Sequence, residues 1–146
     1  MSELTLRAAV PDDAEAIRAC LADAYAQARR DIPDLPDVTA GIQDDINAHE
    51  VVVAEAQGRL LGVIVFGQDE EVLMIFNLGV SPHAQGRGVA RRLLGAAEVF
   101  AAAAGLSTLC LRTHRLMKGT RAMYRHLGWQ EVEARGNIIR MEKPVT

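Results

Sequence analysis

Residues 71–94 read EVLMIFNLGVSPHAQGRGVARRLL. The first ten of these residues are mostly apolar at both odd and even positions, which is typical of a strand in the middle of a sheet. A glycine-rich turn follows, and the spacing of apolar residues then predicts a helix from near Gly88 to about Ala104. Leu106–Thr113 is predicted to be another buried strand. A strand, a crossover helix and a strand in this order predict a parallel strand pair with a right-handed connection.

The rest of the chain predicts further elements on both sides of this unit, because apolar runs of helical or alternating period are separated by turn residues. These elements are a strand at Leu4–Ala8, a helix from Ala14 to about Arg30, a shorter helix at Thr39–Ala48, a β-hairpin with strands at Val51–Ala56 and Leu60–Phe66, a helix at Lys118–Leu127, and a terminal strand pair at Trp129–Val132 and Asn137–Glu142. The predicted fold class is therefore α/β (α+β), a mixed sheet with helices on both faces. The length predicts a single domain over residues 1–146.

The composition excludes several classes of protein. Apolar residues make up 49% and charged residues 24% of the chain, which excludes a mostly disordered protein. The net charge of −3 argues against general binding to nucleic acid. No apolar run approaches the roughly 20 residues that a membrane helix requires, and residues 1–13 lack the layout of a secretory signal. We expect a cytoplasmic protein that binds neither nucleic acid nor membrane.

Cysteine and histidine usage predicts no metal site and no disulfide framework. The chain has only two cysteines, Cys20 and Cys110, which are too few for a four-cysteine zinc site. Cys110 lies in a predicted buried strand, where a thiol is an ordinary apolar filler. The four histidines are scattered and show no metal-ligand spacing.

Charge is distributed unevenly along the chain. Residues 11–50 carry ten acids against three arginines, a net charge of −7, and residues 85–126 carry eight bases against one acid, a net charge of +7. The asymmetry suggests two faces with different partners, one attracting cations and the other attracting anions. Two solvated helix surfaces that differ by chance would give the same arithmetic.

The loop before the long predicted helix has the character of an anion site. Backbone N–H groups at a helix N-terminus have no partner within the helix. Gly86 and Gly88 leave no side chain in the way of an approaching phosphate, and Arg87, Arg91 and Arg92 add positive charge. A glycine-rich turn that only lets a helix start close to a sheet is the alternative.

Two common phosphate loops do not fit these residues. A P-loop requires Lys-Ser or Lys-Thr after its last glycine, and here Val89 follows Gly88. A Rossmann fingerprint requires a small residue where Arg91 stands and an acid about 20 residues later, which residues 108–113 do not supply.

A better match is found in another family. Residues 85–90, QGRGVA, resemble the Gln/Arg-x-x-Gly-x-Gly/Ala pyrophosphate loop of the GNAT N-acetyltransferase superfamily. Leu78-x-Val80-x-Pro82 is similar to the strand and turn that precede that loop in the family. Residues 122–129, AMYRHLGW, resemble its Ala-x-x-Tyr-x-x-x-Gly-Phe segment, and residues 6–13 resemble its usual opening. The resemblance covers nearly the whole chain in the family's order.

The resemblance implies a mostly antiparallel sheet that opens between the parallel pair, near Leu78–Val80 and Cys110–Arg112, with acetyl-CoA in the opening. It implies that the backbone of two strand residues pairs with the pantetheine arm and that the loop and helix start hold the phosphates. The implied cofactor-binding residues are Leu78, Val80, Gln85, Gly86, Arg87, Gly88, Val89, Ala90 and Arg91. Further candidates for the phosphates are Arg92, Lys118 and Arg121. No metal is implied.

The resemblance also implies an activity, acetyl transfer to a primary amine by direct attack in a ternary complex. Tyr124 matches the tyrosine thought to protonate the departing sulfur, although an ordinary half-buried aromatic would also suit its position. Met74 stands where some relatives place a glutamate that acts as the general base, and it cannot accept a proton. Met117 stands where an asparagine is common. Other candidates for the general base are Glu70, Glu71, His83, His114 or a water chain.

The acceptor and the catalytic role are less defined. The acidic residues 11–50 would form one wall of the acceptor site, which favours a polyamine-like, amino-sugar or peptide amine. We expect a monomer or a homodimer. The alternative functions are a non-catalytic acyl-CoA-binding module that senses or regulates, and a binder of nucleotide phosphates.

Overall fold

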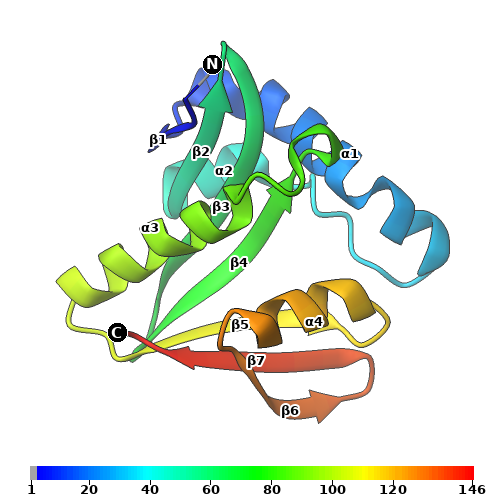
Figure 1. The fold of residues 1–146 in the computed structure, drawn as a ribbon, viewed down its shortest axis with the longest axis vertical. Coiled ribbons are helices and arrows are strands. Elements are labelled where there is room, and N and C mark those ends of the chain that lie inside the picture. The colour runs from blue at the N-terminus through cyan, green and yellow to red at the C-terminus, as the bar shows by residue number, and fades with distance from the viewer. Residues whose placement is uncertain (1–2) are drawn as a thin grey trace.

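The computed structural model describes residues 3–146, and one sheet of seven strands runs through it (Figure 1). The strands are β1 (Thr5–Ala8), β2 (Glu50–Ala56), β3 (Arg59–Asp69), β4 (Val72–Val80), β5 (Thr108–His114), β6 (Gln130–Arg135) and β7 (Ile138–Pro144). The α-helices are α1 (Ala14–Asp31), α2 (Ile42–Ala48), α3 (Val89–Ala103) and α4 (Lys118–His126). Short 3₁₀ turns at Pro11–Asp13 and Pro82–Ala84 precede α1 and the glycine-rich loop.

The strand order is β1-β2-β3-β4-β5-β7-β6, and every neighbouring pair is antiparallel except β4 and β5. The mixed, mostly antiparallel sheet confirms the predicted fold class. β4 is the central strand of the seven, as its two apolar faces predict. It is joined to its parallel neighbour through α3, the crossover helix that the sequence predicts.

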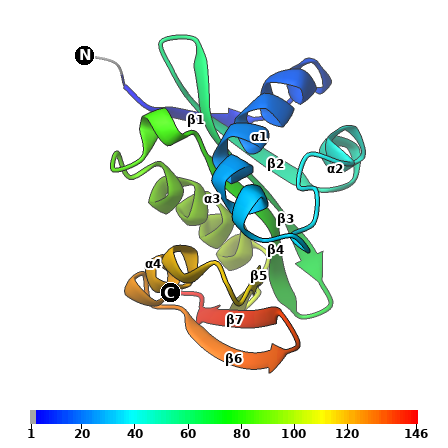
Figure 2. The same ribbon diagram turned by 90° about the vertical axis from the view of Figure 1, so that its right-hand side faces the viewer.

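Helices cover both faces of the sheet (Figure 2). On one face, α1 and α2 pack on β2 and β3 through a cluster that includes Ile17, Leu21 and Val63, all fully buried. On the other face, α3 and α4 pack on the sheet through a larger cluster that contains Leu93 and Tyr124. The larger cluster runs across β4 and β5, with residues of β2, β3 and β7 on either side of that pair.

Most predicted boundaries differ from the observed ones by only a few residues. The predicted helix at Thr39–Ala48 begins later, at Ile42, because Gly41 adopts a left-handed backbone conformation with φ of +78° and ends the preceding turn. β3 is longer than predicted and continues to Asp69. The glycine closures after the two C-terminal helices are observed, with φ of +75° at Gly105 and +99° at Gly128.

Candidate active site

The central opening of the sheet results from the short pairing of β4 with β5. Only Leu73–Ile75 of β4 are in register with β5, at Leu109–Leu111. Beyond Ile75, β4 is bonded to β3 alone, so the end of β4 and the end of β5 diverge (Figure 1). A cleft of about 640 Å³ lies beside the diverging end of β4. It is lined by residues of α1, β4, α3, α4 and the loop that precedes α3.

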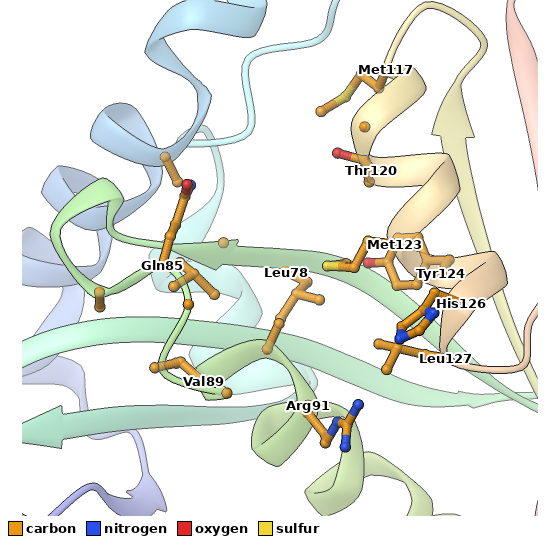
Figure 3. Close-up of a pocket in the computed structure, with 18 of the residues that line it drawn as sticks. Leu78, Gln85, Val89, Arg91, Met117, Thr120, Met123, Tyr124, His126 and Leu127 are labelled. Carbon is orange, nitrogen blue, oxygen red and sulfur yellow. The ribbon is translucent and has the colours of Figure 1, made fainter.

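One end of the cleft is formed by the glycine-rich loop and the start of α3 (Figure 3). Gly86 and Gly88 have φ of +82° and +75°, and a Cβ added at either position would meet no atom within 4 Å. Gly88 is the N-cap of α3, and no side chain of residues 3–146 caps this helix end. The backbone N–H groups of the first turn therefore keep their hydrogen-bonding capacity for a group in the cleft.

The start of α3 is fixed against the sheet by a close approach to β3. A Cβ added to Gly62 would lie 2.8 Å from Cγ1 of Val89, which is closer than side chains pack. Val89 and Ala84 are both buried and anchor the two ends of the loop in the core. The loop is thus exposed between two fixed points, which keeps its backbone beside the cleft.

The structure separates the basic residues that the sequence groups together. Arg91 lines the cleft, whereas Arg87 and Lys118 are exposed and do not. Arg92 donates to the carbonyl of Leu4 at 2.8 Å. Arg121 forms a two-pronged ion pair with Glu131, at 2.7 and 2.9 Å, and this pairing makes it a structural contact instead of the phosphate ligand that the sequence allows.

One lining residue has a side chain that suits anions and was not predicted. His126 comes from the end of α4 and lines the cleft together with Arg91 (Figure 3). The sequence noted it only among the scattered histidines, because nothing local relates it to the glycine-rich loop.

Tyr124 lies at the opposite end of the cleft from the loop. It projects from α4 into the cleft (Figure 3). Its ring contacts Trp129 edge to face, with the ring centroids 5.5 Å apart. Burial raises the pKa of its phenol, and the nearby Tyr25 raises that pKa further. The hydroxyl makes no hydrogen bond to another residue of 3–146 and keeps its proton at neutral pH. A proton donor is thus held inside the cleft.

A second tyrosine, Tyr25 of α1, borders the same region. Its hydroxyl donates to the carbonyl oxygen of Leu78 at 2.8 Å, and burial raises its pKa to about 12. Tyr25 lies on the face of α1 that packs on the sheet, and the sequence analysis does not predict this contact. The polar end of an aromatic side chain on that face was the available signal.

The cleft continues through the divergent strands to the other face of the sheet. A narrow throat of about 50 Å³ lies between it and a second cavity of about 500 Å³, and shares lining residues with both. Tyr25 and Met117 line all three spaces, and Tyr124 borders the cleft and the throat. Two cavities therefore meet beside the Tyr124 phenol.

The second cavity is walled by the loop between α1 and α2, which three side chains hold in place. Asp34 accepts a hydrogen bond from Asn137 at 2.7 Å and lies 2.8 Å from Nε2 of His114. Asn77 of β4 donates to the carbonyl of Val38 at 3.0 Å. Of the ten acids in residues 11–50, only Asp34 lines this cavity, so the acids form no continuous wall there.

The predicted candidates for a general base are not placed to act on a group in the throat. Glu70, Glu71 and His83 line none of the three spaces. His114 borders the second cavity, but its Nδ1 accepts from the backbone N–H of Leu116 at 3.1 Å. Its Nε2 therefore carries the proton and donates to Asp34, which leaves no free ring nitrogen.

Two other residues singled out in the sequence are packing residues. Met74 is buried and lines none of the three spaces. Cys110 is fully buried in β5, as predicted, and burial raises the pKa of its thiol. A thiol of this kind is a poor nucleophile because it remains protonated.

Comparisons with known proteins agree on the class of this cleft. A profile of the Acetyltransferase (GNAT) family matches residues 15–129. The chain is 29% identical over 136 residues to the uncharacterized N-acetyltransferase YhfO of Bacillus subtilis, covering 88% of this chain and 91% of that protein. The molecule is thus an N-acetyltransferase, as the sequence predicts. It belongs to the GNAT acetyltransferase family.

Solved structures share the fold at low sequence identity. The PaiA N-acetyltransferase of Thermoplasma acidophilum, in complex with coenzyme A, gives a TM-score of 0.88 at 16% identity, covering 97% of this chain and 99% of that one. The ribosomal-protein-S18-alanine N-acetyltransferase of Escherichia coli gives 0.81 at 18% identity, covering 99% and 95%. In residues 3–146, no helix has the length and apolar character that crossing a membrane requires.

Proposed function

We propose that this enzyme transfers an acetyl group from acetyl-CoA to a primary amine of a small molecule or peptide, by direct attack within a ternary complex. The observation that carries the proposal is the meeting of two cavities beside one buried phenol. The cleft runs from the free end of α3 to Tyr124, and the throat at Tyr124 opens toward the second cavity. The two substrates can thus be bound at the same time, one in the cleft and the other in the second cavity.

The residues of the cleft fit a pantetheine thioester with a diphosphate. The uncapped helix end and the unobstructed glycines suit the diphosphate, since phosphate oxygens can approach bare backbone N–H groups. The end of β4 offers backbone groups along the cleft, although the Leu78 carbonyl already accepts from Tyr25. The proposed binding residues are Leu78, Val80, Gln85, Gly86, Arg87, Gly88, Val89, Ala90 and Arg91. Arg87 would contribute through its backbone alone.

When bound, acetyl-CoA supplies a carbonyl carbon activated by a thiolate leaving group. Tyr124 then acts as the general acid: its phenolic proton passes to sulfur as the carbon–sulfur bond breaks and the bond between the amine nitrogen and the carbonyl carbon forms. A phenol suits this step because its raised pKa keeps the proton in place until a thiolate develops.

We assign no side chain as the general base. The amine loses its proton to solvent through the second cavity, since none of the candidate bases has a free acceptor at the throat. The rate should therefore rise with pH and level off once the pH exceeds the pKa of the acceptor amine itself.

A test of the proposal combines a binding measurement with a turnover measurement. Calorimetry with acetyl-CoA is expected to give micromolar or tighter binding, and ATP and NAD are expected to give none. Thiol release is then followed over a panel of primary amines. Binding without release for every amine would favour a sensory acyl-CoA-binding module, and binding of ATP in place of acetyl-CoA would contradict the proposal outright.

Three further properties remain proposals. A single sheet spans residues 5–144 and supports one N-acetyltransferase domain over 1–146. The cytoplasmic location rests on the sequence composition, and the choice between monomer and homodimer is open to measurement by light scattering.

A further inference from the structure

The second cavity contains an arginine without a partner. Arg112 of β5 lines both the throat and this cavity. Among residues 3–146 it forms no ion pair and no side-chain hydrogen bond, although nine ion pairs of arginine or lysine with a carboxylate are present elsewhere. A cation at the point where two substrates meet has an obvious use if one of them is anionic.

A second arginine lies beside Arg112 on the neighbouring strand. Arg112 is in register with Arg140 of β7, so two cations are direct cross-strand neighbours. Arg140 has its own partner, Glu142, at 3.3 Å. Like charges placed opposite each other on a sheet are unfavourable, and an anion at Arg112 would relieve that repulsion.

The acid in the cavity is already engaged. Each oxygen of the Asp34 carboxylate has a partner, His114 for one and Asn137 for the other. At the far end of the cavity stands a second arginine, Arg135, whose nearest acid is 3.7 Å away and which is largely exposed. The lining carries two arginines against this one carboxylate, so its net charge is positive, whereas the acidic residues 11–50 favour a negative one.

The remaining lining offers apolar surface. Phe76 and Ile138 are 47% and 51% exposed, and both line this cavity. Leu35 and Val38 of the loop between α1 and α2 face the same cavity. Phe76 is held by the ring of His49, with the two centroids 4.4 Å apart. This surface suits the carbon skeleton of a small molecule.

We propose that the acceptor is a small primary amine that carries a carboxylate or phosphate group and an apolar body, with Arg112 binding the anionic group. This inference rests on the proposed function and names the substrate class of the same site. Because Arg112 borders the throat as well as the second cavity, the anionic group lies close to the amine, as it does in amino acids and aminophosphonates. A guanidinium binds either group through paired hydrogen bonds.

The test compares amines that differ only in the anionic group. Phenylalanine, its phosphonate analogue and 2-phenylethylamine form one set, and leucine with 3-methylbutylamine forms another. We expect kcat/KM, expressed per concentration of unprotonated amine, to be at least about tenfold higher for the anionic member of each set, which corresponds to one charge-assisted contact. The carboxylate and phosphonate arms show which anion is preferred.

Substitutions then assign the preference to one residue. Arg112→Gln is expected to bring the ratio within each set close to one while the KM of acetyl-CoA stays unchanged, and Arg112→Glu is expected to favour the uncharged members. Arg140→Gln is the matched control, because Arg140 is on the neighbouring strand and lines neither the throat nor the second cavity.

Two failures can be told apart. Thiol release that is equal or faster with 2-phenylethylamine, or a preference that survives Arg112→Gln, would overturn the role of Arg112 and leave acetyl transfer intact. No release with any amine of either charge would count against the proposed function itself.

Discussion

The two ends of the active site are built in different ways. The end that faces the glycine-rich loop comes from one continuous stretch, residues 84–91, whose backbone does the binding that we propose. The second cavity is assembled from α1, the loop after it, β4, β5 and the β6–β7 turn, and side chains from all of them meet there. A site made of consecutive backbone groups can be recognised in a sequence, whereas a site made of distant side chains becomes visible only in the fold.

The largest effect is expected where a side chain covers the backbone of the glycine-rich loop. Gly88→Val is expected to weaken acetyl-CoA binding by about 100-fold or more, as the loss of two charge-assisted N–H contacts would. A Cβ added at Gly88 meets no protein atom within 4 Å, so apart from the strain of the positive φ the effect falls on what approaches the loop. Calorimetry with acetyl-CoA measures the change.

The control for this variant is Gly58→Val in the turn between β2 and β3. Gly58 has φ of +74°, nearly the +75° of Gly88, and nothing lies within 4 Å of its added Cβ. Both variants should lose a similar free energy of unfolding, about 1–2 kcal/mol, because valine is strained at positive φ. Equal loss of affinity in both would show that the effect is one of stability alone.

The second prediction concerns the point at which the two regions meet. Tyr124→Phe removes the proton donor without removing the ring that packs on Trp129. We expect kcat to fall about 100-fold, as is usual for the loss of a general acid, with the dissociation constant of acetyl-CoA unchanged. Pre-steady-state thiol release measures the chemical step directly.

Tyr25→Phe provides the comparison for Tyr124→Phe. It removes the hydrogen bond to the Leu78 carbonyl and should cost about 1 kcal/mol of unfolding free energy, with a rate loss of less than about tenfold. A larger rate loss for Tyr25→Phe than for Tyr124→Phe would indicate that Tyr25 is the general acid, and would contradict our proposal.

A smaller effect is expected in the wall of the second cavity. Asp34→Ala frees the loop from His114 and Asn137, so the acceptor must order the loop when it binds. We expect the KM of the acceptor to rise about five- to tenfold, with no change in the KM of acetyl-CoA. Asp37→Ala is the control: Asp37 lies on the same loop and pairs with Arg29, but does not line the cavity.

The features that the sequence predicts are local ones, like the glycine-rich loop, and the features that it does not predict depend on distant segments, like the second cavity. The sheet, the crossover helix and the loop were predictable because periodic apolar residues and glycines act locally. The family resemblance located Tyr124. The pairing of Arg121 with Glu131, the contact of Tyr25 with Leu78 and the position of Arg112 beside the throat depend on strand order and register, which no local pattern encodes.

The smallest effect is expected at an ion pair that lines neither the cleft nor the second cavity. Arg7 of β1 holds Asp13 with two hydrogen bonds, at 2.8 and 2.9 Å, and lowers the pKa of that carboxyl from 3.8 to about 2. A lowered pKa in the folded state means that the ion pair stabilises the protein fully above about pH 4 and that this contribution is lost as the pH falls through 2.

Asp13→Asn is therefore expected to reduce the free energy of unfolding at pH 7 by about 1 kcal/mol, a value kept small by the exposure of Arg7 to solvent. The difference from the unsubstituted protein should shrink below pH 4 and vanish only below pH 2, as measured by urea unfolding across that range. The KM values of acetyl-CoA and of the acceptor should both stay unchanged. If either moved, a loss of stability far from the cleft would be enough to disturb substrate binding, and the effects expected at Gly88 and Asp34 could not be assigned to the two ends of the site.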